Sequence, residues 1–219
     1  MTPAERLERY ARLAVEVGSN VGEGQLVWVS ALPEHAPLAR AIARVAYENG
    51  ARYVDVEYAD QHVRRARIEL APDDTLGWTP PWALAKVDHV AEQRGALIQI
   101  VGDPEPELLA DLDGTRVGRT RMRELAERYV KATNQRLINW VIVAYPNEGW
   151  AASVFGEPDV ERLWDAVADA TRLGEPDPVA AWRAHIDKLV ERAELLNERA
   201  FDQVRFRGPG TDLTVGLIP

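Results

Sequence analysis

The sequence predicts an α/β fold: a Rossmann-like, mainly parallel sheet with helices on both faces, followed by a helical segment and a C-terminal antiparallel hairpin. Three observations predict it. Short apolar runs alternate with helix-period segments from residue 26 to residue 144, the composition turns helical from Asp159 to Phe201, and two short strand patterns flank Gly208-Pro209-Gly210. Strands that alternate with helices form mainly parallel sheets covered on both faces.

The first element is a helix that begins at Thr2-Pro3-Ala4-Glu5 and ends near Gly18. Thr can cap a helix, Pro fits its first turn, and Glu at the third helical position can reach back to the cap. The apolar run Leu26-Val27-Trp28-Val29 follows. A continuous apolar run is typical of a parallel strand that is buried on both faces.

A βαβ unit comes next. A helix of small residues after Pro37 stops at Asn49-Gly50, and Tyr53–Tyr58 reads as the second strand. Its crossover is expected to be right-handed. Helices are predicted near residues 60–70 and 83–94, before a third strand at Ala96–Val101.

Gly102-Asp103-Pro104 is predicted to open another helix, and residues 115–133 are strongly helical. A fourth strand at Trp140–Ala144 stops at Pro146, and Gly149-Trp150-Ala151 reads as a turn. We expect residues 1–201 to form the α/β domain. Residues 202–219 would begin a truncated second, metal-binding domain, or form a hairpin that returns to the first.

Composition excludes several classes of function. The formal charge of −9 and the pI near 5.0 disfavour binding to nucleic acids or anionic membranes. The absence of cysteine excludes disulfides, thiolate nucleophiles and Cys-ligated metals, and fits a reducing cytoplasm. The first residues form a charged helical pattern instead of a signal peptide, and no apolar run approaches the ~20 residues of a membrane span. We therefore expect a cytoplasmic protein.

Motifs for nucleotide or metal chemistry are missing. The sequence contains neither a G-x-x-x-x-G-K-[ST] phosphate loop nor an H-E-x-x-H zinc helix. His35 lies just past the first strand, where open α/β sheets bind ligands, although a solvated loop histidine is the favoured interpretation. A small-molecule or nucleotide-binding module that uses Ser30 and His35 stays open as an alternative function, as does an interaction domain without catalysis.

Two further clusters favour structural interpretations. His185 and Asp187 spell H-x-D, but on a helix they point to different faces, so we assign neither to a metal. Arg116, Arg119 and Arg123 would share one helix face, most simply solvated and partnered by acidic residues nearby at Glu124 and Glu127.

Tryptophans are frequent, at seven residues. Four of them lie on apolar patterns and are predicted to be core: Trp28, Trp140, Trp164 and Trp182. Trp78 and Trp82 bracket a proline pair in a loop, so lining a groove or an interface is about as plausible for them as packing into the core.

An ordered set of short motifs gives a more specific indication. These are Ala144-Tyr145-Pro146, Gly149-Trp150-Ala151, Leu163-Trp164, Asp177-Pro178-Val179-x-x-Trp182-x-x-His185, Leu196-Asn197 and Gly208-Pro209-Gly210-Thr211-Asp212-Leu213-Thr214-Val215-Gly216-Leu217. Together they resemble the thermophilic-metalloprotease family of aminopeptidases, of the aminopeptidase T and aminopeptidase S type. The opening Tyr10-Ala11-x-Leu13 and Val21-Gly22-Glu23-Gly24-Gln25 resemble the start of that family.

The resemblance implies a longer enzyme: a two-metal aminopeptidase that removes N-terminal amino acids from peptides, works as a homodimer, and uses zinc, cobalt or magnesium. This chain alone is expected to be inactive. The Glu, His and Asp ligands of the longer enzyme lie in its second half, and residues 1–219 match none of them, so no catalytic or metal-binding residue is assigned here. The apolar ending Leu217-Ile218-Pro219 suits a truncated chain. We expect an inactive half that shapes the substrate cleft, with Trp78, Trp82 and Trp150 as candidate cleft residues.

Overall fold

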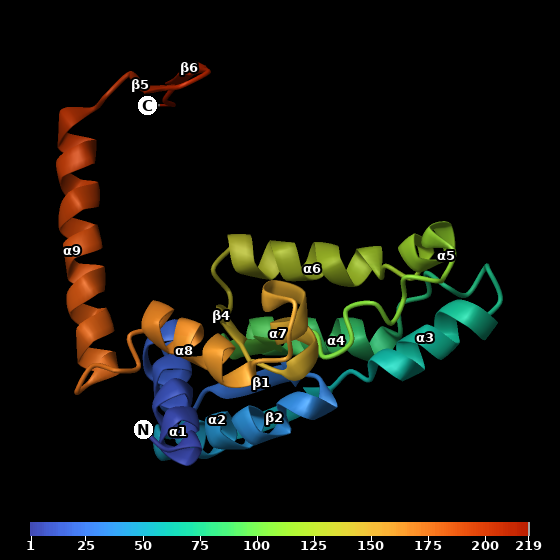
Figure 1. Cartoon of the computed structure of the whole chain (residues 1–219). Coiled ribbons are helices and arrows are strands. Elements are labelled where there is room, and N and C mark those ends of the chain that lie inside the picture. The colour runs from blue at the N-terminus through green and yellow to red at the C-terminus, as the bar shows by residue number, and fades with distance from the viewer. Residues whose placement is uncertain (219) are drawn as a thin grey trace. The chain divides into compact units, whose positions relative to one another are not determined.

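The computed structural model describes residues 1–218, and the chain divides into two compact units, Met1–Val179 and Ala180–Pro219. We call them unit 1 and unit 2 and describe each by itself. Figure 1 shows their helices and strands in chain order. The boundary that the sequence predicts at residue 202 stays a prediction.

Unit 1 is built on a four-stranded parallel sheet. The strands are β1 (Leu26–Ala31), β2 (Tyr53–Tyr58), β3 (Ala96–Val101) and β4 (Asn139–Ala144), in the order β2-β1-β3-β4. All three pairings are parallel and in continuous register. The predicted strands and the predicted fold class are therefore confirmed.

One face of the sheet is covered by the N-terminal elements. These are α1 (Pro3–Leu13), the π-helix η1 (Ala14–Gly18) and α2 (Ala36–Glu48). The predicted cap is present, because the Thr2 hydroxyl accepts from the Glu5 N–H and the Glu5 carboxylate accepts from the Thr2 N–H at 2.7 Å. Gly18 lets η1 approach the sheet, since a Cβ there would lie 2.7 Å from a methyl carbon of Val141.

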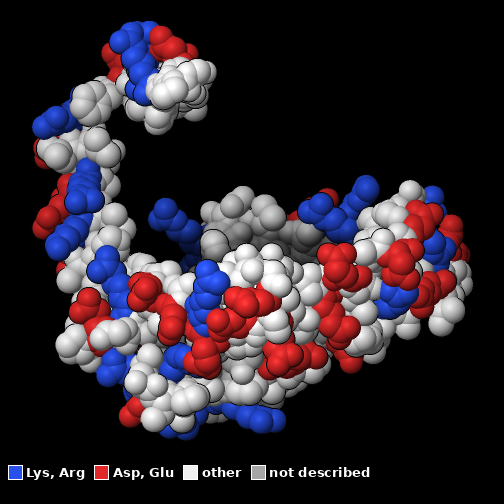
Figure 2. Space-filling view, viewed as in Figure 1, with Lys and Arg blue, Asp and Glu red and all other residues white. Residues whose placement is uncertain are grey.

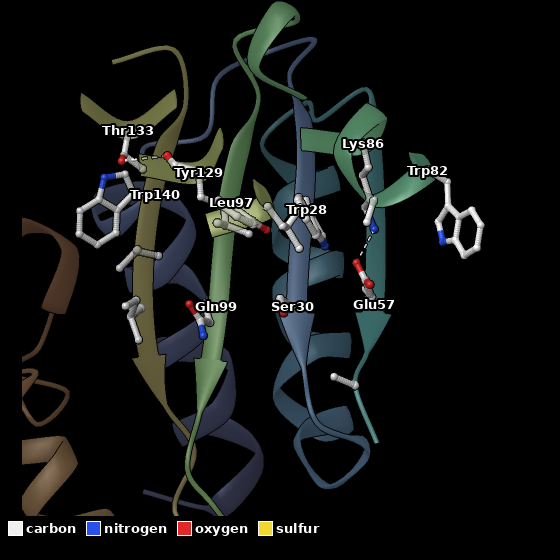
Figure 3. A pocket seen from close by; sticks show the side chains of 15 residues that line it. Trp28, Ser30, Glu57, Trp82, Lys86, Leu97, Gln99, Tyr129, Thr133 and Trp140 are labelled. Carbon is white, nitrogen blue, oxygen red and sulfur yellow. Dashed lines mark hydrogen bonds and ion pairs between the residues drawn. The ribbon is translucent and has the colours of Figure 1, made fainter. Parts of the chain in front are cut away.

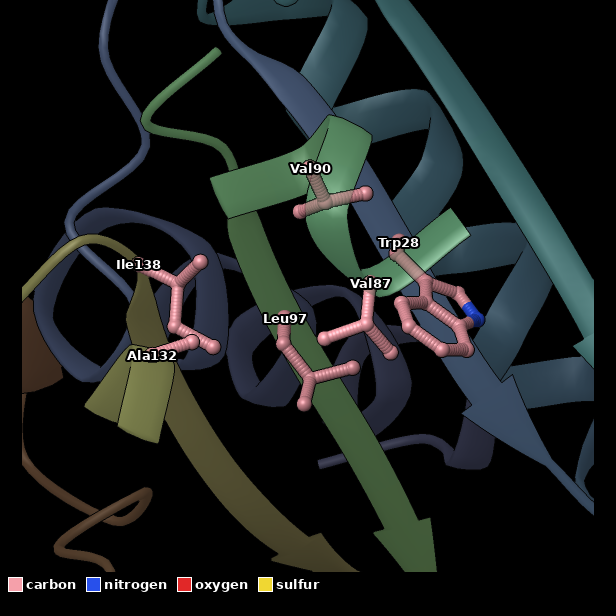
Figure 4. Close-up of a cluster of buried hydrophobic side chains, with 6 residues drawn as sticks. All are labelled: Trp28, Val87, Val90, Leu97, Ala132 and Ile138. Atoms are coloured by element: carbon pink, nitrogen blue, oxygen red, sulfur yellow. The ribbon is translucent and has the colours of Figure 1, made fainter. Parts of the chain in front are cut away.

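The opposite face is covered by α4 (Pro81–Glu92) and α6 (Arg123–Asn134). Figure 4 shows the apolar cluster that these helices form with the sheet, which contains Trp28, Val87, Val90, Leu97, Ala132 and Ile138. Burying a side chain of this size stabilises the fold by about 1.5–3 kcal/mol. This cluster fixes the two helices over the first half of β1 and β3.

The segment after β3 differs from the sequence prediction. No helix begins at Gly102-Asp103-Pro104, and residues 104–112 form turns before the short α5 (Gly114–Arg119). The Asp103 side chain accepts from the Glu105 N–H at 2.9 Å, and two prolines follow Asp103 within three residues. Proline cannot donate to a helical ladder, which explains why the turn does not propagate.

The prediction that Arg116, Arg119 and Arg123 share one helix face is also wrong. Residues 115–133 are split into α5 and α6 at Thr120–Met122. Arg116 and Arg119 instead bind the carboxylate of Asp73, and Arg116 Nε also donates to the Ile68 carbonyl at 2.8 Å. Ile68 belongs to α3 (Gln61–Leu70), so these arginines join α5 to α3.

Unit 1 is closed by α7 (Glu148–Phe155) and α8 (Val160–Ala170). The predicted turn at Gly149-Trp150-Ala151 is thus the first part of a helix. On α8, Glu161 accepts from both terminal nitrogens of Arg6, at 2.9 and 3.1 Å, and the ring of Trp164 contacts Tyr10 edge-on. The first helix of the chain therefore packs against the last helix of the unit.

Unit 2 consists of most of α9 (Pro178–Arg199) and the hairpin β5 (Gln203–Gly208) and β6 (Thr211–Gly216). The predicted antiparallel hairpin is confirmed. Gly210 follows Pro209 and has φ +76°, the positive value that a type II turn requires of its third residue. No helix within residues 1–218 is both long and apolar enough to cross a membrane.

Candidate functional site

A hollow on the sheet face that α4 and α6 partly cover is lined in part by Trp82, one of the candidate cleft residues. It has a volume of about 640 Å³, and we call it the sheet groove. The two helices cover only part of that face, so the later residues of the strands remain accessible between them. Its walls contain Trp28, Ser30, Glu57, Trp82, Lys86, Leu97, Gln99, Leu125, Tyr129, Thr133, Trp140 and Ile142. Figure 3 shows these side chains.

Strand register places the groove residues in two rows across the sheet. The first row is Trp28, Leu97 and Trp140, with Asp55 beside Trp28 on β2, and the second is Glu57, Ser30, Gln99 and Ile142. In Figure 3 Trp28, Leu97 and Trp140 lie towards the beginnings of the strands, and Ser30 and Gln99 lie nearer the strand ends. Every second residue of a strand points to the same face, which is why the rows form.

Aromatic side chains give the groove its apolar character. Trp28 is buried, and Tyr129 of α6 packs over it with ring centroids 5.6 Å apart. Trp140 is 53% exposed and Trp82 is 69% exposed. The prediction that Trp140 is a core residue is therefore wrong, whereas Trp28 and Trp164 are buried as predicted and Trp182 is half-buried. Exposed tryptophans in a hollow are typical of contact surfaces.

The charged group of the groove is Lys86 on α4. Its ammonium lies 2.6 Å from an Asp55 carboxylate oxygen and 2.7 Å from a Glu57 carboxylate oxygen, and 4.3 Å from the centre of the Trp28 ring. Burial lowers the pKa of Lys86, but the hydrogen bonds that its ammonium donates to the two carboxylates outweigh this effect, so the pKa is raised overall. Lys86 is therefore a fixed cation that anchors α4 to β2, and its proton is not available to general acid–base chemistry near neutral pH.

The three predicted cleft residues, Trp78, Trp82 and Trp150, do not all line the sheet groove. Trp78 and Trp82 form an edge-to-face pair with centroids 5.7 Å apart, and Trp78 is 54% exposed. Trp82 reaches the sheet groove, but Trp78 is not one of the groove-lining residues. Trp150 lies on α7, is half-buried and is not among the groove residues either. Of the three predicted residues, only Trp82 lines the sheet groove.

The strand-end crevice between β1 and β3 is filled by the protein itself. His35, in the short 3₁₀ helix η2 (Pro33–His35), is fully buried, so the prediction of a solvated loop histidine is wrong. Its Nδ1 accepts from the Leu32 N–H at 3.1 Å, which leaves the proton on Nε2, and Nε2 donates to the Gly102 carbonyl at 2.8 Å. Burial lowers the pKa of His35 and keeps the ring neutral.

The same crevice is closed from the side of β4. The amide of Asn147 donates to the Gly102 carbonyl at 2.9 Å, and the ring of Tyr145 contacts His35. Gly102 has φ +132°, and a Cβ there would lie 2.3 Å from the Tyr145 carbonyl oxygen. These contacts occupy the position where open α/β sheets bind nucleotides. They count against the alternative function that uses His35.

The described residues do not fit a metal centre. Within residues 1–218, no group of three or more His, Asp or Glu side chains is arranged to hold a metal ion. His62, for example, has Glu105 as its carboxylate contact at 2.8 Å, and both side chains are about half exposed or more. Figure 2 shows acidic and basic side chains intermixed on the visible face of unit 1, without a continuous basic patch there.

Sequence reasoning missed Glu57, Lys86, Gln99 and Tyr129 as groove residues. The usable signal was alternation within the strands: Asp55 and Glu57 alternate with valines in β2, and Gln99 interrupts an apolar run in β3. Polar residues at every second position indicate that one face of a strand is accessible. Lys86 and Tyr129 lie on helices, where the pattern alone does not reveal which strand they face.

Fold and surface together define an α/β protein with a parallel sheet and an aromatic groove on one face of that sheet. Residues 3–219 match the model of the family described as thermophilic metalloprotease (M29). The chain belongs to this family.

Curated relatives agree with this assignment. The chain is 40% identical to "Aminopeptidase T" of Thermus aquaticus over 97% of its own length and 53% of the relative's. It is 35% identical to "Aminopeptidase 2" of Geobacillus stearothermophilus, over 98% and 53%. The solved structure "Wild-type AmpT from Thermus thermophilus" is similar with a TM-score of 0.87 and 36% identity, over 97% of this chain and 53% of that one. The chain thus spans about half the length of the relatives that it matches.

Proposed function

We propose that this chain is the N-terminal, non-catalytic half of a metal-dependent aminopeptidase that removes N-terminal amino acids from peptides. The observation that carries the proposal is a combination: the chain matches its family over residues 3–219 yet covers 53% of aminopeptidase T, and its described residues hold no metal-ligand cluster. Divalent ions, zinc, cobalt or magnesium, would then be bound by residues outside this chain.

The contribution of this half is to shape the substrate cleft. The pair of Trp78 and Trp82, together with the sheet groove, presents rigid aromatic surface that can restrict access to peptide ends. Trp150 on α7 is a second candidate wall residue. Aromatic walls restrict access by shape, and they require no charge or proton transfer from this half.

The domain organisation is part of the proposal. Residues 1–201 form the α/β domain, and residues 202–219 begin the second, metal-binding domain. The change from a parallel sheet to an isolated antiparallel hairpin supports this division. We further propose a homodimer in the cytoplasm. The absence of cysteine supports a reducing compartment, and the family resemblance supports the dimer, which light scattering on a sizing column would test.

The central test compares this chain with a fusion. The fusion joins the 219 residues to the portion of Thermus aquaticus aminopeptidase T that they do not match. Hydrolysis of leucine p-nitroanilide is measured with added Co²⁺, Zn²⁺ or Mg²⁺. We expect metal-dependent turnover from the fusion and none from the chain alone. Metal-dependent turnover by the purified chain would show that this half is catalytic and overturn the proposal.

A further inference from the structure

The floor of the sheet groove runs across all four strands of unit 1. It is formed by the second row, with Glu57, Ser30, Gln99 and Ile142 each contributed by a different strand. Neighbouring strands lie about 4.8 Å apart, so the row spans roughly 14 Å, the length of about four residues of an extended or polyproline II peptide. All groove residues belong to unit 1, so its shape is defined within that unit alone.

Main-chain pairing cannot hold a peptide on this floor. The central strands β1 and β3 are each paired on both sides. A peptide that adds to a sheet needs a free strand edge, whereas the floor of the groove is a sheet face. A peptide in the groove is therefore held by side chains, and a peptide whose conformation is already fixed binds there at the lowest entropic cost.

The side chains that line the groove combine flat apolar surface with hydrogen-bond donors. Trp82 and Trp140 are more than half exposed, and Tyr129 on α6 is half-buried. No hydrogen bond within residues 1–218 engages the side chains of Trp82, Trp140, Ser30 or Gln99. An indole N–H is a donor only, and a hydroxyl or amide can donate as well. The groove therefore offers several donors to the carbonyl groups of a ligand.

A further indole donor is buried in the groove wall. Trp28 is 7% exposed, and its Nε1–H has no hydrogen-bond partner within the described residues. In Figure 3 this nitrogen lies on the side of Trp28 that faces Lys86 and Glu57. Buried donors in native proteins are almost always paired, because an unpaired one is costly. A ligand carbonyl at this end of the groove would satisfy the N–H of Trp28.

A proline-rich segment matches this combination of surfaces. Proline has no backbone N–H, so such a segment brings carbonyl acceptors and few donors that need partners. It adopts the polyproline II conformation before binding, and its rings pack on aromatic side chains. An ordinary extended peptide brings one N–H per residue, for which the groove offers few acceptors.

Charge selects against acidic residues at the β2 end of the groove. Asp55 and Glu57 carry two negative charges there and Lys86 carries one positive charge, so this end is negative overall. The two carboxylate side chains are 44% and 51% exposed, so a ligand can approach them. An acidic residue of the segment is repelled at this end, whereas an apolar or basic residue is not.

We propose that the sheet groove binds a proline-rich, non-acidic segment of the peptide substrate, downstream of the bond that is cleaved. The inference rests on the proposed function, because the ligand is part of a peptide substrate. Trp82 and Trp140 then determine specificity by contact with the segment, and they take no part in the cleavage itself.

Binding is measured on the 219-residue chain by calorimetric titration and by the indole N–H signals of ¹⁵N-labelled protein. The probes are the hexapeptides APPLPP, APPDPP and AAALAA. We expect APPLPP to bind at least about fivefold more tightly than either of the others. It should shift the signals of Trp82 and Trp140 but not that of Trp164, which is buried outside the groove. Equal affinities, or no binding at 10 mM peptide, overturn the inference.

Two variants test the contacts. Trp140→Phe keeps an aromatic ring and removes the indole donor, and Gln99→Leu removes the amide at similar size. Each should weaken the binding of APPLPP about three- to tenfold, the effect of one lost hydrogen bond. Trp150→Phe is the matched control outside the groove and should change the affinity less than about twofold. An unchanged Trp164 signal shows that a variant is folded, and unchanged affinity in both groove variants overturns the inference.

The fusion with the unmatched portion of aminopeptidase T tests the source of the segment. KM for LGGPPLPP should be at least about threefold lower than KM for LGGAALAA, and Gln99→Leu should remove the difference. Equal KM values would assign the groove to a segment of another protein, and a fusion that no longer binds APPLPP would assign it to the second half of the enzyme. Both results overturn this inference alone, whereas hydrolysis by the isolated chain removes the proposed function.

Discussion

The Nε2 of His35 and the carbonyl oxygen of Gly102 lie 2.8 Å apart and join the segments that follow β1 and β3. The bond crosses the place where the strand order changes direction, between neighbours β1 and β3. A histidine at the ligand-binding end of an α/β sheet is here a structural link, because both of its nitrogens are used within the protein.

Replacing this link should destabilise unit 1. In His35→Ala the Leu32 N–H loses its acceptor in a partly buried setting and the lost ring leaves a cavity, which together should cost about 1–3 kcal/mol. Urea unfolding followed by circular dichroism measures the change. His62→Ala is the matched control, because the His62 side chain is 63% exposed, and its effect should stay within about 0.5 kcal/mol. Equal effects of the two variants would contradict the structural role.

The same residue makes stability depend on pH. Its pKa is lowered in the folded protein from the ordinary 6.5, so below pH 6.5 the unfolded chain binds a proton that the folded chain does not. By linkage, stability rises with pH in this window and is lost as the pH falls below 6.5 towards the folded pKa. The free energy of unfolding should therefore fall more steeply between pH 7.5 and pH 5.5 for the natural chain than for His35→Gln. Parallel curves would show that His35 does not contribute.

Two helical glycines should respond to alanine with opposite signs. In α7, a Cβ on Gly149 would lie 1.8 Å from the Pro104 carbonyl oxygen, so Gly149→Ala should cost about 1–3 kcal/mol despite the better helix propensity of alanine. Gly118 in α5 has no heavy atom within 4 Å of that position, so Gly118→Ala should stabilise by up to about 1 kcal/mol. Thermal unfolding of both variants measures the difference, and a stabilising Gly149→Ala would show that the approach to Pro104 is not obligatory.

Loss of the groove cation should weaken the attachment of α4 to β2. Lys86→Met removes the ion pairs to Asp55 and Glu57 and the contact over Trp28, together about 1–2 kcal/mol at low salt. Because the pKa of Lys86 is raised above 10.5, its contribution is complete below pH 10.5 and disappears as the pH rises through the folded pKa. Lys131→Met on α6 serves as control. If Lys86→Met and Lys131→Met lose the same free energy of unfolding at pH 7, the ion pairs of Lys86 do not stabilise the fold. The same conclusion follows if 0.5 M NaCl does not reduce the loss in Lys86→Met.

The proposed cleft role predicts a kinetic effect. In the fusion with the unmatched portion of aminopeptidase T, Trp82→Ala should raise KM for a tetrapeptide about 3–30-fold with little change in kcat, since a remote wall contributes to binding more than to chemistry. Leucine p-nitroanilide, which is too short to reach far from the scissile bond, should be affected less. Trp150→Ala tests the second candidate in the same way. Unchanged KM in both variants would remove these tryptophans from the cleft.

Strand positions were predictable from the sequence because they depend on local patterns. The four parallel strands and the hairpin appear where their apolar runs and turn residues indicate. The failures concern residues whose environment is set by distant segments. Gly149 reads as a turn residue, yet its missing side chain serves the approach of Pro104 to a helix.

The groove illustrates the same limit. Trp140 lies in an apolar run that looks like core, but β4 is an edge strand and α6 covers only part of its face, so the indole is half exposed. His35 is the reverse case. A polar residue that the sequence places in a solvated loop is fully buried, and both of its ring nitrogens form hydrogen bonds within the protein. Neither outcome follows from local periodicity, because Trp140 depends on how far α6 extends and His35 on the segments that follow β3 and β4.

The pairing of α1 with α8 has a consequence for synthesis. Arg6 and Glu161 are separated by 155 positions in the chain, and the ring of Trp164 packs against Tyr10 close by. At about 5–20 residues per second, a ribosome needs roughly 8–30 s to make that stretch, so the first helix to emerge waits the longest for its partner. Until then the part of α1 that α8 covers, with Arg6 and Tyr10, is open to chaperones. Completion of α8 is thus the step that ends the vulnerable period of the nascent chain.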